Sequence, residues 1–159
     1  MRVSAAVDYA VRAAVVLACE PTGAWVKGDA IAAGQGMSFR YAEQLLAGLR
    51  RAGLVESQRG AEGGYRLARP AASIVVADIV RAVDGPLGAV RGEAPEQVDY
   101  PAPADHVRDL WVATRSALRD VLERVTLADL ATGAFPEPVV TLLRDPTAWE
   151  RRDRPPGVR

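Results

Sequence analysis

The chain of 159 residues lacks the features that mark disulfide-linked secreted proteins and membrane spans. Its single cysteine, Cys19, excludes an internal disulfide framework and favours a reducing, cytoplasmic location. The longest early apolar run, Ala13 to Cys19, is too short to cross a bilayer, and the charged Asp8 and Arg12 before it argue against a signal peptide. Net charge is also absent, because 20 basic residues balance 20 acidic ones. The composition therefore predicts one globular domain plus an appendage.

The most informative stretch runs from Met37 to Pro70 and reads MSFRYAEQLLAGLRRAGLVESQRGAEGGYRLARP. Ser38 is placed to cap a helix whose apolar residues recur at helical spacing, and Gly53 is placed to end it. Two short runs follow, Leu54 to Gln58 and Gly64 to Ala68, and the glycine-rich segment between them is typical of a hairpin. We therefore predict a recognition helix followed by a wing, an arrangement suited to DNA.

Charge is distributed unevenly along the chain, although its sum is zero. Six arginines and three glutamates lie between Arg40 and Arg69, whereas Glu93 to Asp109 holds five acids and one arginine. The basic part coincides with the predicted helix and wing. This local excess, and not the global charge, indicates a nucleic-acid partner.

The segments around this stretch predict further helices. Apolar spacing predicts a helix over Ser4 to Cys19 and a short helix around Gly28 to Gly34, with Gly36 marking the turn into the recognition helix. After Pro70, the run from Ile74 to Val83 predicts an extended piece followed by a helix. The fold class expected is mainly α with a small β wing.

A long helix is predicted from Asp105, because apolar residues recur there at alternating steps of four and three. This spacing keeps one stripe on one face, as a seam between two helices requires. An ordinary core helix is the alternative interpretation. The predicted seam residues are Val107, Trp111, Thr114, Leu118, Val121 and Val125.

Four segments summarise the expected organisation. Residues 1–86 are a winged helix-turn-helix domain, and residues 87–104 are an acidic, proline-containing loop. Residues 105–132 hold the long helix and a short capped helix from Thr126 to Leu130. Residues 133–159 are expected to form a partly disordered tail, with one helical turn around Val139 to Leu143.

These elements, in this order, resemble the Rrf2 family of transcriptional regulators. The opening helix (SAAVDYAVRA), the helix-and-hairpin stretch, IVRAVDGPL and the late TLADL carry the resemblance, which covers roughly the first 130 residues. The resemblance implies a homodimer, with a winged helix-turn-helix at each end and the long helix at the dimer interface.

The first turns of the predicted recognition helix contain side chains of the types that contact DNA bases and phosphates. Glutamate accepts from the cytosine amino group, glutamine pairs with adenine, and serine reaches phosphate or base. The resemblance implies base-reading roles for Ser38 and Glu43. Tyr41 is expected to pack under the wing instead. Arg40 is expected to read guanine or to hold a phosphate. The full set predicted on this helix is Ser38, Arg40, Tyr41, Glu43 and Gln44.

The wing supplies the second group of predicted DNA contacts. Arg59 matches a family position that enters the minor groove, where narrow A·T-rich segments attract a guanidinium. Gly60, Gly63 and Gly64 either allow close approach to phosphates or satisfy the turn geometry. Phosphate contacts that add salt-dependent affinity are predicted for Arg50, Arg51, Arg66 and Arg69.

The best-known members of the family bind an iron–sulfur cluster through three cysteines in the loop before the long helix. Here that loop, Gly88 to His106, contains no cysteine, so we predict no cluster, no metal and no cofactor. Asp8 matches an oxygen-ligand position of some relatives and is expected to pair with Arg12 instead. Cys19 is expected to be buried, and redox sensing is the alternative role for it. The loop acids Glu93, Glu96 and Asp99, with Tyr100, are where an effector or protein partner could act, and a solvated connector is the alternative interpretation of this loop.

The sequence thus predicts a sequence-specific transcriptional repressor that binds a two-fold-symmetric DNA operator as a homodimer. The alternative is a winged-helix module that binds a protein partner and not DNA. An enzyme is not predicted, because His106 stands alone in a proline-rich loop without a nucleophile or second acid–base group beside it.

Overall fold

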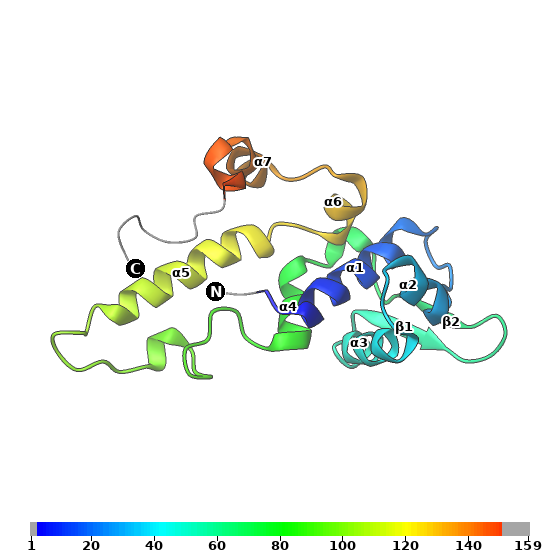
Figure 1. Cartoon of the computed structure of the whole chain (residues 1–159), viewed down its shortest axis with the longest axis horizontal. Helices are drawn as coiled ribbons and strands as arrows, with labels where there is room; N and C mark the ends of the chain where they lie inside the picture. Colours follow the sequence, from blue (N-terminus) through cyan, green and yellow to red (C-terminus); the bar gives the residue numbers. More distant parts are fainter. Residues whose placement is uncertain (1–2, 151–159) are drawn as a thin grey trace.

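The computed structural model describes residues 3–150 (Figure 1). Most helices and the two-stranded hairpin gather into a winged-helix body, and one long helix extends away from it. The α-helices are α1 (Ala5–Cys19), α2 (Gly28–Gly34), α3 (Phe39–Arg51), α4 (Val76–Asp84), α5 (Val107–Leu122), α6 (Leu127–Thr132) and α7 (Glu137–Arg144). The strands are β1 (Val55–Gln58) and β2 (Gly64–Leu67), and short 3-10 turns are η1 (Ala71–Ser73), η2 (Pro95–Gln97) and η3 (Pro146–Trp149).

Helix α1 forms the centre of the winged-helix body. Ser4 caps it, since its Oγ accepts a hydrogen bond from the amide of Val7 at 3.1 Å. The buried face is rich in alanine, which lets α3, α4 and α6 pack closely around it. The fully buried core includes Ala10, Ala13, Ile31, Leu46, Leu49, Ile74, Ile79 and Leu127.

The predicted ion pair on α1 is confirmed and extends to α2. Arg12 Nη1 lies 3.5 Å from the Asp8 carboxylate. The same guanidinium donates to the side-chain and main-chain oxygens of Gln35, at 3.0 and 2.6 Å. Arg12 therefore connects α1 to the end of α2, immediately before the turn that leads into α3.

The recognition helix and the wing form as the local sequence predicts. Ser38 caps α3 through its Oγ, which accepts from the amide of Tyr41 at 3.3 Å, and the buried face is Ala42, Leu45, Leu46 and Leu49. The strands pair antiparallel, with Val55 opposite Leu67 and Gln58 opposite Gly64. Val26 adds a bridge to Tyr65 through two backbone hydrogen bonds of 2.9 and 2.8 Å. The hairpin is thereby attached to the segment that precedes α2.

The long helix is shorter than the apolar spacing predicts. Helix α5 ends at Leu122, and Val125 lies beyond it with a side chain only 5% exposed. The Val125 carbonyl accepts from the amide of Val76 at 2.9 Å, and its side chain clusters with Val76 and Val139. Val125 is therefore a core residue of its own chain, so its assignment to the dimer seam was wrong.

The segment after α6 contains more helix than expected. Thr126 and Asp129 form a reciprocal capping box at the start of α6, as the sequence indicates. Beyond it, α7 has eight residues and Val139 is buried, so the expectation of a tail with a single helical turn was wrong for this part. A buried apolar residue provides the packing that keeps this helix in place. Residues 151–159 of the predicted tail lie outside the described residues.

Cys19 is exposed, contrary to the expectation of burial. The buried side of α1 runs through Ala10, Ala14 and Leu17. A residue two positions after Leu17 is rotated by about 200° around the helix, which directs it away from the core.

Within the described part of the chain, no helix is long and apolar enough to cross a membrane.

Candidate nucleic-acid interface

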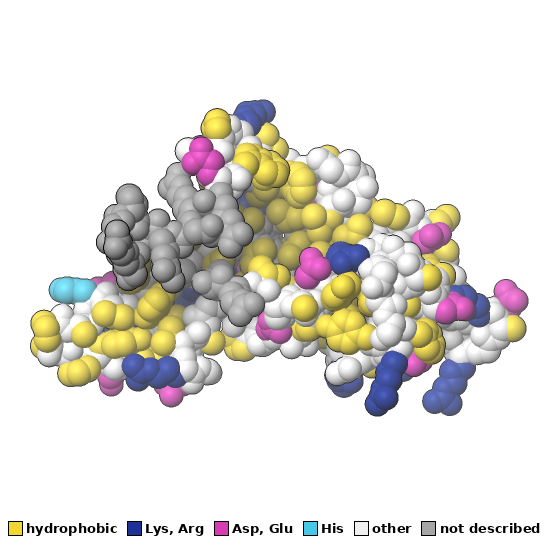
Figure 2. Space-filling model, in the orientation of Figure 1, with side chains coloured by type: hydrophobic (Ala, Val, Ile, Leu, Met, Phe, Trp, Pro, Cys, Tyr) yellow, Lys and Arg dark blue, Asp and Glu magenta, His cyan; other side chains and the backbone are white. Residues whose placement is uncertain are grey.

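The outer face of α3 presents a row of polar and charged side chains. Arg40, Glu43, Gln44 and Arg50 are exposed, and their spacing places them on the side opposite the buried leucines. Together with Ala47 and Tyr65 of β2 they line a shallow depression of about 450 Å³. The structure therefore brings four of the predicted α3 and phosphate contacts together at one surface. Basic side chains project from the region of α3 and the wing (Figure 2).

Arg50 joins this helix face to the wing. Its Nη1 donates to the Ser57 Oγ on β1 at 2.9 Å. Arg51, on the neighbouring position, is exposed. The orientation of the hairpin relative to α3 is thus fixed by a side-chain contact in addition to the shared core.

The wing turn places Arg59 and Gly60 at an exposed tip. Gly63 is buried, and a Cβ there would lie 2.1 Å from the Gln58 carbonyl oxygen. At Gly64, a Cβ would lie 2.3 Å from the Val26 carbonyl oxygen. Both glycines are required by the packing of the hairpin itself. Of the two roles left open for them, the structure supports the turn geometry.

Lys27 holds the tip of the wing and was missed by sequence reasoning. Its Nζ donates to the carbonyl oxygen of Gly60 at 3.2 Å and also to that of Ala61. It is the sole lysine among the 20 basic residues of the chain. Being the single lysine of the chain is the only sequence feature that could have drawn attention to Lys27, because its hydrogen-bond partners lie more than thirty residues away.

The expectation that Tyr41 packs under the wing was wrong, because its side chain packs on α1. Its ring meets that of Tyr9 edge to face, with centroids 5.7 Å apart and an interplanar angle of 85°. The aromatic residue of the hairpin is Tyr65 on β2, and its ring lies with that of Phe39 against Gly28 at the start of α2. The helical position of Tyr41, one residue before buried Ala42, turns it toward α1.

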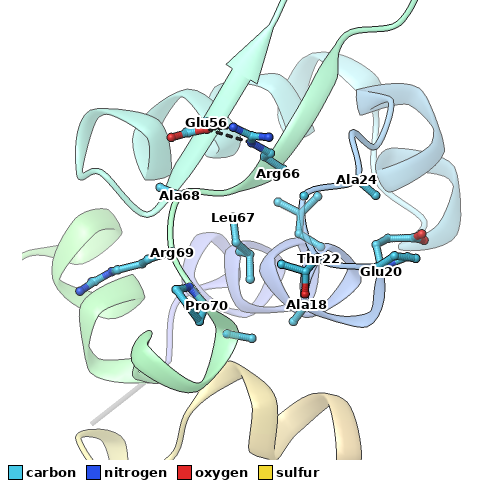
Figure 3. A pocket seen from close by; sticks show the side chains of 14 residues that line it. Ala18, Glu20, Thr22, Ala24, Glu56, Arg66, Leu67, Ala68, Arg69 and Pro70 are labelled. Atoms are coloured by element: carbon cyan, nitrogen blue, oxygen red, sulfur yellow. Dashed lines mark hydrogen bonds and ion pairs between the residues drawn. The ribbon is translucent and has the colours of Figure 1, made fainter.

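Two predicted phosphate contacts are engaged within the chain. Arg66 Nη2 lies 2.8 Å from the Glu56 carboxylate, and its guanidinium stacks over Trp25 at 4.3 Å. Arg69 Nη2 lies 3.0 Å from Asp78. Both arginines line a cavity of about 260 Å³ between the end of α1 and β2. Figure 3 shows the Arg66 side chain directed toward Glu56, and the Arg69 side chain directed away from that pair. These internal pairs reduce the charge available for phosphate.

The geometry of a capped recognition helix beside an arginine-tipped hairpin agrees with comparisons to known proteins. The model of the Rrf2 family, described as iron-dependent transcriptional regulators, matches residues 3–133. The chain belongs to the Rrf2 family. It is therefore a DNA-binding transcriptional regulator with a winged-helix fold.

Relatives of known name support this assignment. A Mycobacterium tuberculosis H37Rv protein, provisionally named an HTH-type transcriptional regulator, is 47% identical over 150 residues, which are 94% of this chain and 93% of that protein. The structure of CymR, the global cysteine regulator of B. subtilis, is 35% identical, has a TM-score of 0.71, and covers 84% of this chain and 98% of its own. The structure of T. potens IscR is 36% identical, has a TM-score of 0.66, and covers 84% of this chain and 88% of its own.

The iron implied by the family description does not fit the side chains of this Rrf2 regulator. An iron–sulfur cluster needs thiolates, alone or with imidazoles, and the sole cysteine stands at the end of α1. His106 is exposed and faces Asp109 at 3.3 Å and Asp105 at 3.9 Å. Among residues 3–150, no group of three or more His, Cys, Asp or Glu side chains is arranged to hold a metal ion.

Proposed function

We propose that this Rrf2 regulator is a cytoplasmic, cluster-free repressor that binds a two-fold-symmetric operator as a homodimer. The observation that carries the proposal is the surface formed by the outer face of α3 and the wing tip. It offers the exposed outer face of α3 for the major groove, and the exposed wing tip carries Arg59, which we assign to the adjacent minor groove. Repression follows from the proposal if the operator overlaps the site where the polymerase binds.

Individual roles on α3 follow from what each side chain has left to offer. Ser38 uses its hydroxyl oxygen to cap the helix, which leaves the hydroxyl proton free to donate to a phosphate or a base. Glu43 and Gln44 are exposed about one and a half helical turns further, where they reach base edges once the helix enters the groove. Arg40, Arg50 and Arg51 supply phosphate contacts.

The dimer is supported by the exposed apolar side of α5. Within residues 107–122, all of them described, no side chain is fully buried. Leu110 is 57% exposed and Trp111 38% exposed. Figure 2 shows further hydrophobic surface at the loop that precedes α5. A second copy of α5 would cover this surface. The proposed seam keeps Val107, Trp111, Thr114 and Leu118, and adds the exposed Leu110. Val121 stays at its end, where the half-buried side chain also packs against the cluster of Val76, Val125 and Val139 in its own chain.

Selection of bound DNA from a random pool with purified protein tests the DNA part of the proposal. The expected result is a consensus with two related half-sites, bound by a dimer in light scattering, with affinity that falls steeply with salt. Binding that is weak and insensitive to both salt and sequence would favour the alternative, a module that binds a protein partner.

The cluster-free state is tested by purification under anaerobic conditions. The expected sample is colourless and contains no stoichiometric iron or sulfide. An iron–sulfur absorption band with stoichiometric iron would overturn this part alone, because it leaves the operator experiment unaffected. A reporter gene placed behind the selected operator then decides between repression and activation.

A further inference from the structure

We propose that a cleft between α4 and α5 is a binding site for a small multivalent anion, either a di- or tricarboxylate or a phosphate compound. The cleft has a volume of about 390 Å³. Its charged lining comes from Arg81 on α4, Arg115 and Arg119 on α5, and Glu96 on η2. Small and apolar residues between Gly85 and Ala94 form the remaining wall.

The charge of the cleft favours an anion. Among the described residues that line it are three guanidinium groups and one carboxylate, whereas Asp78 and Glu123, which pair with two of these arginines, are not lining residues. Guanidinium groups bind carboxylates and phosphates through paired hydrogen bonds, which are stronger than neutral ones. A ligand with two or more anionic groups can bridge arginines that come from different helices.

Arg115 is the innermost of the three arginines. Its side chain is only 12% exposed, and its Nη2 lies 2.6 Å from the Glu96 carboxylate. This hydrogen bond lowers the pKa of Glu96, so the carboxylate stays ionised. A Cβ on Gly88 would lie 3.0 Å from the Cβ of Arg115, which shows that the loop lies directly against α5. The inner wall of the cleft is therefore closely packed.

Arg81 and Arg119 are held less firmly. Arg81 is shared between Asp78, at 3.4 Å, and Glu123. Arg119 Nε is 3.8 Å from the same Glu123 carboxylate. Side chains of both arginines are about two-fifths to one-half exposed (39% and 47%), and ion pairs at such positions are weak. An incoming anion can thus compete with Glu123 for both guanidinium groups.

The position of the cleft connects ligand binding to the placement of α5. The pair between Arg81 and Glu123 joins α4 of the winged-helix body to the residue just after α5. An anion that binds Arg81 in place of Glu123 breaks this connection and, with it, changes the angle between the DNA-binding body and the dimer helix. This regulatory step rests on the proposed function, whereas binding of the anion does not.

Binding is tested on the full chain without DNA, by calorimetry and thermal shift. The carboxylate probes are malonate and citrate, and the phosphate probes are inorganic phosphate and pyrophosphate, each compared with sodium chloride at equal ionic strength. At least one probe is expected to bind saturably and to raise the melting temperature, and the preferred series identifies the ligand chemistry. If no probe exceeds the chloride control, the proposal fails.

Matched arginine variants locate the site. Arg81→Gln and Arg119→Gln are expected to weaken probe binding by about tenfold each, as loss of a charged hydrogen bond does. Arg124→Gln is the control, because Arg124 pairs with Asp120 at 3.2 Å outside the cleft. Equal losses in all three variants would show non-specific attraction and overturn the site. Circular dichroism confirms that each variant is folded.

The regulatory step has a separate readout. Operator affinity is measured with and without the probe that binds best, in the unchanged protein and in Arg81→Gln. A change in operator affinity that the probe causes in the unchanged protein and not in Arg81→Gln supports coupling. If the probe binds without changing operator affinity, the coupling is wrong but the anion site stands. A protein that binds anions and no DNA would contradict the proposed function alone.

Discussion

The ammonium group of Lys27 donates to the carbonyl oxygen of Gly60 at 3.2 Å, joining the segment before α2 to the tip of the wing. A second hydrogen bond from the same group reaches Ala61. The tip carries Arg59, so the lysine determines where the proposed minor-groove contact is presented. The conformation of this exposed turn depends on a residue far away in the sequence.

Replacing Lys27 with Met should therefore weaken operator binding about 2- to 10-fold, since an intramolecular hydrogen bond contributes roughly 0.5–1.5 kcal/mol. Hydrogen exchange at the turn amides should become faster. Fluorescence anisotropy with labelled operator measures the affinity. Lys27→Arg keeps two or more donors and should restore most of it. Unchanged affinity and exchange in Lys27→Met would show that the contact does not order the wing.

Arg59→Ala should weaken operator binding by about tenfold and lower the magnitude of the salt dependence by about one unit of slope. The loss should be largest on operators with A·T-rich flanks, whose narrow minor groove attracts the guanidinium. Glu62→Ala, in the same turn, is the control and should not lower affinity. If Arg59→Ala and the unchanged protein bind with equal affinity in gel shifts, whatever the flanking sequence of the operator, the minor-groove assignment is wrong.

Glu43→Ala should relax base specificity at one position of each half-site, at a cost of about 1–3 kcal/mol against the wild-type base. Binding to a set of single-base operator variants measures this. Arg51→Ala provides the contrast, because a phosphate contact is expected to weaken binding to all sequences alike. Uniform loss in Glu43→Ala would place this residue outside base recognition.

Trp111→Ala should shift the protein from dimer toward monomer at low micromolar concentration, because the side chain is 38% exposed in the single chain and lies in the proposed seam. Light scattering across a dilution series measures the shift. Arg144→Gln, an exposed position on α7, should leave the dimer intact. A dimer that persists in Trp111→Ala and Leu110→Ala together would require a different interface.

Val125→Ala should lower the free energy of unfolding by about 1–3 kcal/mol, since it creates space in the core beside Val76 and Val139. Chemical denaturation at fixed protein concentration measures it. Val112→Ala is the matched control, because Val112 is 36% exposed, and its effect should be smaller. A dimer defect without loss of stability in Val125→Ala would return this residue to the seam.

Among the candidate site residues, those on the outer face of α3 could be predicted from sequence because helix geometry fixes which side a residue occupies. Once Leu45, Leu46 and Leu49 define the buried side, Glu43 and Gln44 have to face outward. The arginine cleft could not be predicted in this way. Its charged groups lie on α4, η2 and α5, and only the packing of these elements brings them together.

The helices, the caps and the hairpin of the winged-helix body could be predicted from local sequence alone, and so could the lack of cysteine ligands in the loop before α5. Apolar periodicity, capping serines and turn glycines act over a few residues, so they are legible without the fold. The folded structure was needed to show that Val125 is buried, that Tyr41 packs on Tyr9 and that Lys27 binds the wing tip. Each of these depends on a partner distant along the chain, and no local pattern specifies which distant surfaces meet.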